Sequence, residues 1–439
     1  MQVQILSKEY IKPSSSSVNR KPYKLSLFDQ LTPTTYSPTA LFYPKNHQNS
    51  DPKLALNNLK KSLSEALNIF YPLSGRIINN FYIDNFNEGA LFVEAQTNIG
   101  ISDFLKHHEI EDLNMFISSQ PFSKEIDTNI PLLQVQFTLF ECGGISVGMS
   151  ASHKLIDGPT GRAFFGSWAC ICRGDFKGII YPDLEQASEY FPPRVSLPEN
   201  HLALMQSLWF TEANYVTRRF VFNNKGTEIL RAQAEGKISR VATLSCFIWK
   251  CCMNASKALS GLVKPSILVE AVNLRPVTNP PMSNSSTGNV FWWATAVADP
   301  SDEEKTELSE LMKLLSESIA LYKSDYTQTF QGPDGYETMS DCCNQLEDLF
   351  ASEKPDIFAF TTWCYLGFNR LNFGWGEPFW TGVLGKVGPS FRNLTIFIET
   401  KDNKGIEAWI TLDQQRMSLL EHDPQFLAFA SPNPRISSL

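Results

Sequence analysis

A histidine and an aspartate four residues apart are the side chains of this sequence best suited to acid–base chemistry. His153 follows a run of small and apolar residues, and Asp157 and Gly158 complete an H-x-x-x-D-G pattern. A neutral imidazole, with an ordinary pKa of about 6.5, can take a proton from an alcohol while that alcohol attacks an electrophile. The pattern therefore favours a histidine general base. The alternative is a core histidine beside an aspartate that caps a helix.

The same stretch contains the pattern of a nucleophilic serine. Gly144–Gly148 reads G-I-S-V-G and matches G-x-S-x-G, the nucleophile elbow of serine hydrolases. That elbow needs a strand before the serine and a helix directly after it, so that the hydroxyl is exposed on a tight turn. Here the glycines precede an expected strand at 145–152, and a helix is not expected until near residue 158. We therefore predict that Ser146 lies inside a strand, where small residues allow close packing.

The carboxylate of Asp157 is expected to pair with a cationic side chain from another part of the chain. It precedes a turn at Gly158-Pro159, which directs its carboxylate away from the side that His153 faces. Arg275 stands at the end of a strand expected in the other half of the chain. We therefore expect Asp157 and Arg275 to form an ion pair.

Both helices and strands are needed to position these residues. Asp51-Pro52 is a good helix start, and apolar residues at helical spacing then predict a helix at 52–70. In the first half we also expect strands at 23–27, 40–43, near 77, 132–140 and 145–152, and a helix at 161–172. In the second half we expect strands at 217–222, 267–274, 358–366, 379–384, 393–399 and 406–412, and helices at 227–234, 243–258, 301–322 and 414–422. Because this order is not a regular βαβ alternation, we predict an α/β fold with mixed sheets.

The length of the chain and a proline-rich middle segment suggest two domains. A chain of 439 residues is long for one hydrophobic core. Several prolines between Pro182 and Pro198 interrupt any regular pattern and indicate a connection. The expected parts are an N-terminal domain at 1–175, a long crossover loop at 176–215 and a C-terminal domain at 216–439.

Bulk composition excludes several classes of partner. Charged residues make up 19% of the chain and the net charge is -8, which argues against nucleic acid as a partner. An apolar run long enough to span a membrane is absent from the sequence, so we expect no membrane span. The nine cysteines include no C-x-x-C spacing. They fit reduced thiols better than disulfides or a zinc site, so we expect a cytoplasmic protein without a metal.

Four motifs together resemble the plant BAHD acyltransferases, which use coenzyme A thioesters. The H-x-x-x-D-G pattern stands at His153–Gly158, and Asn372–Gly376 resembles D-F-G-W-G near the C-terminus. Tyr71–Arg76 resembles Y-P-L-A-G-R, and Asn273–Arg275 reads N-L-R. The resemblance covers nearly the whole chain. Further segments, such as Leu25–Gln30, look most like the branch that contains vinorine synthase and other alkaloid acetyltransferases.

The resemblance implies two chloramphenicol-acetyltransferase-like domains with mixed sheets flanked by helices, and a channel between them. It implies that His153 deprotonates the acceptor hydroxyl and that Asp157 is structural and paired with Arg275. Trp363, with Thr361 nearby, matches the position that supports the tetrahedral oxyanion. The implied reaction moves an acyl group, most simply acetyl, from acyl-CoA as co-substrate to a small-molecule alcohol. It needs neither a permanently bound cofactor nor an acyl-enzyme, and we expect a monomer.

The residues that would bind the acyl donor are less clearly indicated by the sequence. Ser239 and Arg240 precede a predicted helix, and helix N-termini and arginines attract phosphates, so we assign them to coenzyme A; solvated surface charge is the alternative. The resemblance implies that the adjoining loop shapes the donor side away from the chemistry, with its residues Asn372, Phe373, Gly374, Trp375 and Gly376. Asn372 replaces the aspartate of the family motif, so hydrogen bonds can be kept but the charge is lost.

The acceptor does not follow from the motifs. We hypothesise O-acetylation of an alkaloid alcohol, with acylation of a sugar, another alcohol or an amine by the same chemistry as the alternative. Ser286–Val290 stands where anthocyanin malonyltransferases have Y-F-G-N-C, which disfavours malonylation of glycosides. A serine hydrolase and a catalytically inactive binding relative are the remaining alternatives, and Asn372 slightly favours the second of these.

Overall fold

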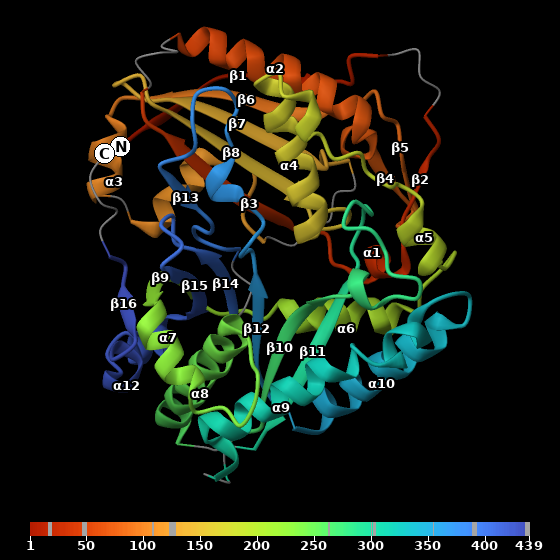
Figure 1. The fold of residues 1–439 in the computed structure, drawn as a ribbon, viewed down its shortest axis with the longest axis vertical. Helices are drawn as coiled ribbons and strands as arrows, with labels where there is room; N and C mark the ends of the chain where they lie inside the picture. Colours follow the sequence, from red (N-terminus) through yellow and green to blue (C-terminus); the bar gives the residue numbers. More distant parts are fainter. Residues whose placement is uncertain are drawn as a thin grey trace.

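Two separate mixed sheets, each built largely from one half of the chain, form the framework of the protein (Figure 1). The computed structural model describes residues 1–434 except 16–19, 46–50, 108, 123–128, 262–263, 300, 302–303, 354 and 389–392. The two large sheets have six and seven strands, and a third sheet has three short ones. Both large sheets combine parallel and antiparallel pairs, which confirms the predicted mixed α/β architecture.

The N-terminal sheet runs in the order β1-β6-β7-β8-β3-β13. Its strands are β1 (Val3–Ile11), β3 (Tyr36–Tyr43), β6 (Ala90–Thr97), β7 (Leu133–Leu139), β8 (Ile145–Ser152) and β13 (Trp380–Gly382). Helices α2 (Pro52–Ile69) and α4 (Gly158–Cys172) pack against each other beside it (Figure 1). Also in this half are β2 (Tyr23–Lys24), β4 (Arg76–Ile78) and β5 (Tyr82–Asp84) of the small sheet, and the helices α1 (Leu27–Leu31) and α3 (Ile101–His107).

The C-terminal sheet runs in the order β11-β10-β12-β14-β15-β9-β16. Its strands are β9 (Tyr215–Asn223), β10 (Ser266–Asn273), β11 (Phe291–Ala298), β12 (Asp356–Thr362), β14 (Leu394–Glu399), β15 (Gly405–Asp413) and β16 (Ala430–Pro432). The helices after α4 are α5 (Gln186–Tyr190), α6 (Glu199–Trp209), α7 (Asn224–Arg231), α8 (Arg240–Ser260), α9 (Leu308–Leu321), α10 (Gly335–Glu353), α11 (Gln414–Leu420) and α12 (Pro424–Leu427). None of the helices within the described ranges is long and apolar enough to cross a bilayer.

The edge strand β13 ties the two halves together. It comes late in the chain but pairs antiparallel with β3, Trp380 opposite Phe42 and Gly382 opposite Ala40. In Figure 1 its blue segment lies with the red and yellow strands of the N-terminal sheet. The division of the chain into 1–175 and 216–439 remains a prediction, and β13 belongs to the sheet of the first part although it lies in the second.

The strongest local patterns predicted their elements correctly. The helix expected at 52–70 is α2, which Asp51 caps by accepting a hydrogen bond from the Lys53 N–H at 2.9 Å. The strand expected at 145–152 is β8 with the same bounds, so Ser146 does lie inside a strand. All eight residues of β8 are buried.

Three expectations about elements were wrong. The segment 176–215 is not irregular throughout, because α6 begins directly after Pro198 and buries His201, Leu204 and Leu208 at helical spacing. The strand expected at 23–27 ends early, since Ser26 caps the short helix α1. The helix expected from residue 301 begins only at Leu308. Prolines and capping signals mark possible boundaries, but tertiary burial selects among them.

The glycines of the serine pattern serve packing. A Cβ on Gly148 would lie 1.8 Å from the carbonyl oxygen of Phe116, which is far inside van der Waals contact. Gly148 therefore lets the segment around Phe116 lie directly against the sheet. Ser146 is fully buried, and its Oγ has no hydrogen-bond partner among the described residues.

Candidate active site

A cavity of about 300 Å³ lies between the two halves and contains four of the predicted site residues, His153, Asp157, Thr361 and Trp363. The N-terminal half contributes the end of β8, α1 and β3, and the C-terminal half contributes β10, β11, β12 and α6. The described side chains that line it are mainly apolar or aromatic, and His153 and Asp157 are the only histidine, lysine, arginine or carboxylate groups among them. Both halves are therefore needed to enclose the site.

The imidazole of His153 is held in one orientation. The backbone N–H of His153 donates to the carbonyl oxygen of Thr35 at 2.8 Å, and its Nδ1 lies 3.1 Å from Oδ1 of Asn289. The Asn289 amide nitrogen donates to the His153 carbonyl oxygen at 2.6 Å, so the Asn289 oxygen is the atom turned toward the ring. A carbonyl oxygen only accepts hydrogen bonds. The proton of the neutral ring therefore sits on Nδ1, and Nε2 keeps its lone pair.

Burial lowers the pKa of His153 below its ordinary value of 6.5. The ring is taken out of water, which disfavours the charged imidazolium. The hydrogen bond to Asn289 and the charge of Asp157 oppose this effect without cancelling it. The imidazole is consequently neutral at neutral pH, the state in which it can accept a proton.

Asp157 and Arg275 form a buried, bidentate ion pair. Arg275 donates from Nη1 to Oδ2 at 2.6 Å and from Nη2 to Oδ1 at 3.1 Å, and the arginine side chain is fully buried. Asp157 also caps α4 through the Thr160 N–H at 3.0 Å and accepts the Val290 N–H at 3.1 Å. Its oxygens are thus occupied by groups other than His153.

The ion pair also fixes the segment that carries Asn289. Nη2 of Arg275 donates to the carbonyl oxygens of Ser286 at 2.8 Å and Gly288 at 2.9 Å. Gly288 has φ +113°, and a Cβ there would lie 2.9 Å from the Tyr23 hydroxyl. Only glycine therefore suits this position. The contact between Asn289 and His153 was not predicted from the sequence, where residues 286–290 were compared with another motif. The available signal was a Gly-Asn pair directly before a strand.

Thr361 and Trp363 stand at the end of β12 beside the cavity. The backbone N–H of Trp363 donates to Phe397 at 2.7 Å, so it is already used by the sheet. The Trp363 ring packs 5.5 Å from that of Phe368, centroid to centroid. The donors that these two residues can offer to the cavity are therefore the indole N–H of Trp363 and the hydroxyl of Thr361.

The predicted donor-side residues lie outside this cavity. Ser239 caps α8 by accepting the Ala242 N–H at 3.0 Å, and Arg240 donates to Asn224 at 2.7 Å and to the Tyr365 hydroxyl at 3.0 Å. Tyr365 directly precedes Leu366, which lines the cavity. Arg240 therefore contacts the residue beside one that lines the His153 cavity.

The loop with the altered motif keeps its internal hydrogen bonds. Oδ1 of Asn372 accepts the N–H groups of Gly374 at 2.8 Å and Gly376 at 3.0 Å. Phe373 is buried with its ring 4.8 Å from Trp168 of α4, and Trp375 packs on Tyr43. The amide therefore replaces the missing carboxylate as a hydrogen-bond acceptor within the loop.

A second cavity, of about 200 Å³, adjoins this loop. Arg162, Arg173 and Arg370 line it together with Asn372 and Leu366. Arg173 is paired with Asp175 at 2.8 Å. Three guanidinium groups at one cavity make it a positively charged pocket, and Leu366 is shared with the His153 cavity.

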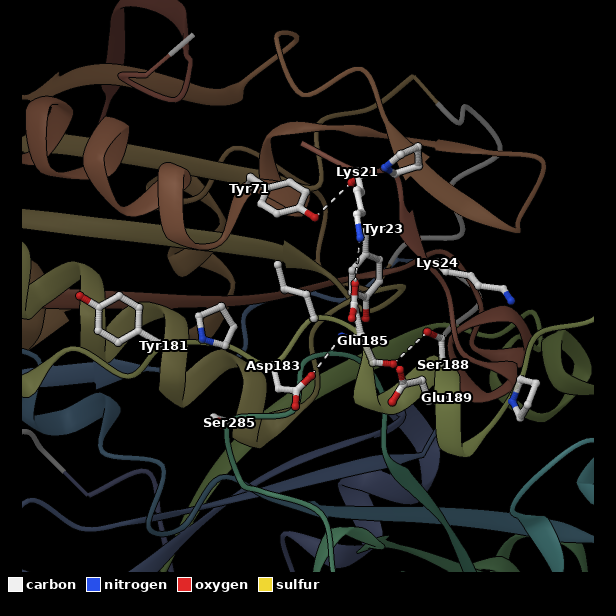
Figure 2. Close-up of a pocket in the computed structure, with 14 residues that line it drawn as sticks. Lys21, Tyr23, Lys24, Tyr71, Tyr181, Asp183, Glu185, Ser188, Glu189 and Ser285 are labelled. Atoms are coloured by element: carbon white, nitrogen blue, oxygen red, sulfur yellow. Dashed lines mark hydrogen bonds and ion pairs between the residues drawn. The ribbon is translucent and has the colours of Figure 1, made fainter. Parts of the chain in front are cut away.

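A larger hollow of about 980 Å³ has a different character (Figure 2). Lys21 and Lys24 line it together with Asp183, Glu185 and Glu189. Neither His153 nor any other predicted catalytic residue borders it. The smaller cavity, which the predicted catalytic residues do line, is therefore the candidate site. Among the described residues no group of three or more His, Cys, Asp or Glu side chains could hold a metal ion.

Replacing Asp157 by alanine is expected to lower the thermal midpoint strongly or to abolish soluble expression, because Arg275 stays buried without its carboxylate. Removing one partner of a buried ion pair typically costs about 3–5 kcal/mol. Glu111→Gln is the control, since it removes one partner of the half-buried Arg218, which keeps its second partner Glu421, and a loss below about 1 kcal/mol is typical of solvent-accessible pairs. Thermal melts of both variants measure the difference. An Asp157→Ala midpoint as high as that of Glu111→Gln would contradict the structural role.

Comparison with known proteins identifies relatives along the full length. The chain matches the Transferase family over residues 1–427. It is 35% identical over 446 residues to akuammiline synthase 2 of Alstonia scholaris, covering 99% of this chain and 98% of that protein. It is 34% identical over 434 residues to stemmadenine O-acetyltransferase of Catharanthus roseus, covering 96% and 97%.

A solved structure agrees with these matches. The crystal structure of vinorine synthase is 32% identical in sequence and superimposes with a TM-score of 0.82, covering 98% of this chain and 99% of that one. The family match, the full-length relatives and the shared two-domain fold lead to one conclusion: this chain belongs to the Transferase family, the family of the BAHD acyltransferases.

Proposed function

We propose that this protein transfers an acyl group, most simply acetyl, from a coenzyme A thioester to a hydroxyl of a small plant metabolite. The observation that carries the proposal is the state of His153. Its Nδ1 bonds Asn289, and its Nε2 has no partner among the described residues in a mainly apolar cavity. An unprotonated ring nitrogen in such a cavity suits a general base for an alcohol. Stemmadenine O-acetyltransferase, a relative at 34% identity, carries this type of reaction in its name.

In the proposed mechanism, Nε2 of His153 takes the proton from the acceptor hydroxyl as its oxygen attacks the thioester carbonyl. The carbon–sulfur bond then breaks, and the imidazolium returns the proton to the leaving thiolate. Asn289 accepts from Nδ1–H throughout and so keeps the ring in position. Thr361 and Trp363 are the proposed donors to the developing oxyanion, a contribution that can reach about 3 kcal/mol for one donor.

The donor is proposed to approach from the side of Arg240. A helix N-terminus and an arginine together favour phosphate groups, and both occur at the start of α8. The arginine-lined cavity at Arg162, Arg173 and Arg370 adds positive charge next to the His153 cavity. These groups fit the phosphates of a coenzyme A thioester. The loop from Asn372 to Gly376 is proposed to shape this side without entering the chemistry.

The lining of the cavity favours a rigid, largely apolar acceptor. The rings of Phe291 and Trp293 lie 5.2 Å apart and those of Trp209 and Trp293 4.7 Å apart, so one wall is aromatic. Such a wall contacts polycyclic skeletons and attracts a protonated amine through cation–π interactions. A sugar would need many more hydrogen-bonding groups than this lining offers. We therefore propose an alkaloid alcohol as the acceptor class.

We further propose that the protein acts as a monomer in the cytoplasm. The cavity is lined by both halves of a single chain, so the site needs no second copy. All nine cysteines are free thiols, which is typical of reducing compartments.

His153→Ala is expected to reduce acetyl transfer to an alcohol acceptor by at least about 100-fold, the usual scale of general-base catalysis. Ser146→Ala is the matched control, because Ser146 is buried in β8 away from the lining of the cavity. It should retain most of the activity. Turnover is measured as free coenzyme A released. The reverse result, an active His153→Ala and an inactive Ser146→Ala, would favour the hydrolase alternative.

The pH dependence should follow the lowered pKa of His153. Only the neutral imidazole accepts a proton, so activity is full above the pKa of His153 and is lost as the pH falls through it. Because burial lowers that pKa, the acidic limb of kcat/KM should lie below pH 6.5, the ordinary histidine value. Rates between pH 4.5 and 8 measure it, with the rate recovered at neutral pH as a check on acid unfolding. A limb above pH 6.5 would contradict the assignment.

Arg240→Gln and Arg370→Gln should each raise the KM for acetyl-CoA by roughly tenfold, since a hydrogen bond to a charged group contributes about 1.5 kcal/mol. They should leave the KM for S-acetylpantetheine unchanged, because that donor lacks the nucleotide phosphates. Arg231→Gln, at an exposed arginine of α7 paired with Glu228, is the control. Equal effects on both donors would show that these arginines do not meet the phosphates.

A further inference from the structure

Asp29 is a buried carboxylate that lies behind His153 and is not among the residues that line the cavity. Its Oδ2 accepts the N–H and the hydroxyl of Ser26, both at 2.8 Å. Its Oδ1 accepts the backbone N–H of Asn289 at 2.6 Å and the side-chain nitrogen of Asn289 at 2.9 Å. The carboxylate thus receives four hydrogen bonds, and two of them come from the residue that touches the imidazole.

The position of Asp29 decides which way the Asn289 amide points. The two hydrogens of its side-chain nitrogen meet Oδ1 of Asp29 and the carbonyl oxygen of His153. A flipped amide would set its oxygen against both of these acceptors, which is repulsive, and would turn its nitrogen toward the ring. In the observed orientation only the Asn289 oxygen can face Nδ1 of His153. The carboxylate of Asp29, the amide of Asn289 and the imidazole of His153 therefore form a hydrogen-bonded series in which each group sets the orientation of the next.

The charged groups around Asp29 suit an ionised carboxylate. Lys154, next to His153, is buried and donates from Nζ to the carbonyl oxygens of Asp29 at 3.1 Å and Gln30 at 2.9 Å and to Oδ1 of Asn80 at 2.8 Å. Burial lowers the pKa of Lys154 to about 7, so this side chain is only partly charged at neutral pH. The Tyr23 hydroxyl donates its hydrogen bond to the Thr287 carbonyl oxygen at 3.0 Å and not to the carboxylate of Asp29. Asp157 and Arg275 are nearby but neutralise each other. Burial raises the pKa of Asp29 to about 6, although its hydrogen bonds to Asn289 and Ser26 act to lower it. The carboxylate is therefore still mainly ionised at neutral pH.

We propose that Asp29 is a positioning residue that acts through Asn289 to hold His153 in the tautomer with its proton on Nδ1. The inference rests on the proposed role of His153 as the general base and adds the group that sets its tautomer. This hydrogen-bonded series joins three distant parts of the sequence: α1, the end of β8 and the segment before β11. In Asp29→Asn the carboxamide offers one acceptor oxygen in place of two, so the Asn289 amide can lose one of the two acceptors that set its orientation.

Asp29→Asn is the direct test, with purified enzyme, acetyl-CoA and an alcohol acceptor. We expect kcat to fall by about 10- to 100-fold, the range found for residues that orient metal-binding histidines, and KM for acetyl-CoA to change less than about threefold. The acidic limb of the pH profile should move to lower pH, because the bond to Asn289 raises the pKa of His153. Asp413→Asn is the control, since it makes the same change at the cap of α11 and should lower the thermal midpoint without moving kcat or the limb.

The tautomer itself is measured by long-range ¹H–¹⁵N NMR of ¹⁵N-histidine-labelled protein, with His153→Ala identifying the signal. The wild type should show Nδ1 protonated and Nε2 unprotonated at neutral pH, and Asp29→Asn should show a mixed or reversed pattern. Wild-type protein with Nε2 protonated overturns the proposal even if Asp29→Asn does not fold. So does an Asp29→Asn variant with an unchanged tautomer and kcat. If His153→Ala itself remains active, the proposed function fails instead, and the two failures are distinguished.

Discussion

The ion pair between Asp157 and Arg275 is the interaction on which the site depends. A buried charge without an opposite charge beside it is strongly destabilising. The planar guanidinium of Arg275 donates one hydrogen bond to each carboxylate oxygen of Asp157. The two residues come from different halves of the chain, so the pair joins those halves at the cavity. It also starts α4 and holds the backbone that carries Asn289. The positions of the groups around His153 therefore depend on the buried ion pair between Asp157 and Arg275.

Burial has a second effect at the same place, on the protonation state of His153. Burial in the mainly apolar cavity lowers the pKa of His153, so the ring stays neutral at neutral pH. A neutral ring can place its proton on either nitrogen, and only one arrangement leaves a lone pair for the substrate. Asn289 makes that choice by hydrogen bonding. Apart from Asp157, which is paired with Arg275, the described lining of the cavity carries no charged side chain.

The altered motif at Asn372 illustrates how a loop can keep its shape while losing its charge. The amide oxygen accepts the Gly374 and Gly376 N–H groups, and glycine at both positions permits the positive φ values of +112° and +103°. Arg173 donates to the Asn372 carbonyl oxygen and pairs with Asp175. A carboxylate for this arginine is therefore supplied by a neighbour two residues away from it. This loop consequently offers no structural reason to regard the protein as an inactive relative.

Local patterns were enough to predict β8, α2 and the mixed sheets, because periodic burial and capping leave a signature within a few residues. They also placed Ser146 inside a strand and the H-x-x-x-D-G pattern at its end. Residue spacing could not reveal that Asp29, 124 residues before His153, contacts Asn289, nor that α6 forms directly after the proline-rich segment. Those features exist only when distant segments are brought together. A hydrogen bond between residues far apart in the chain depends on tertiary packing, and so the partners of His153, unlike His153 itself, became visible only in the folded protein.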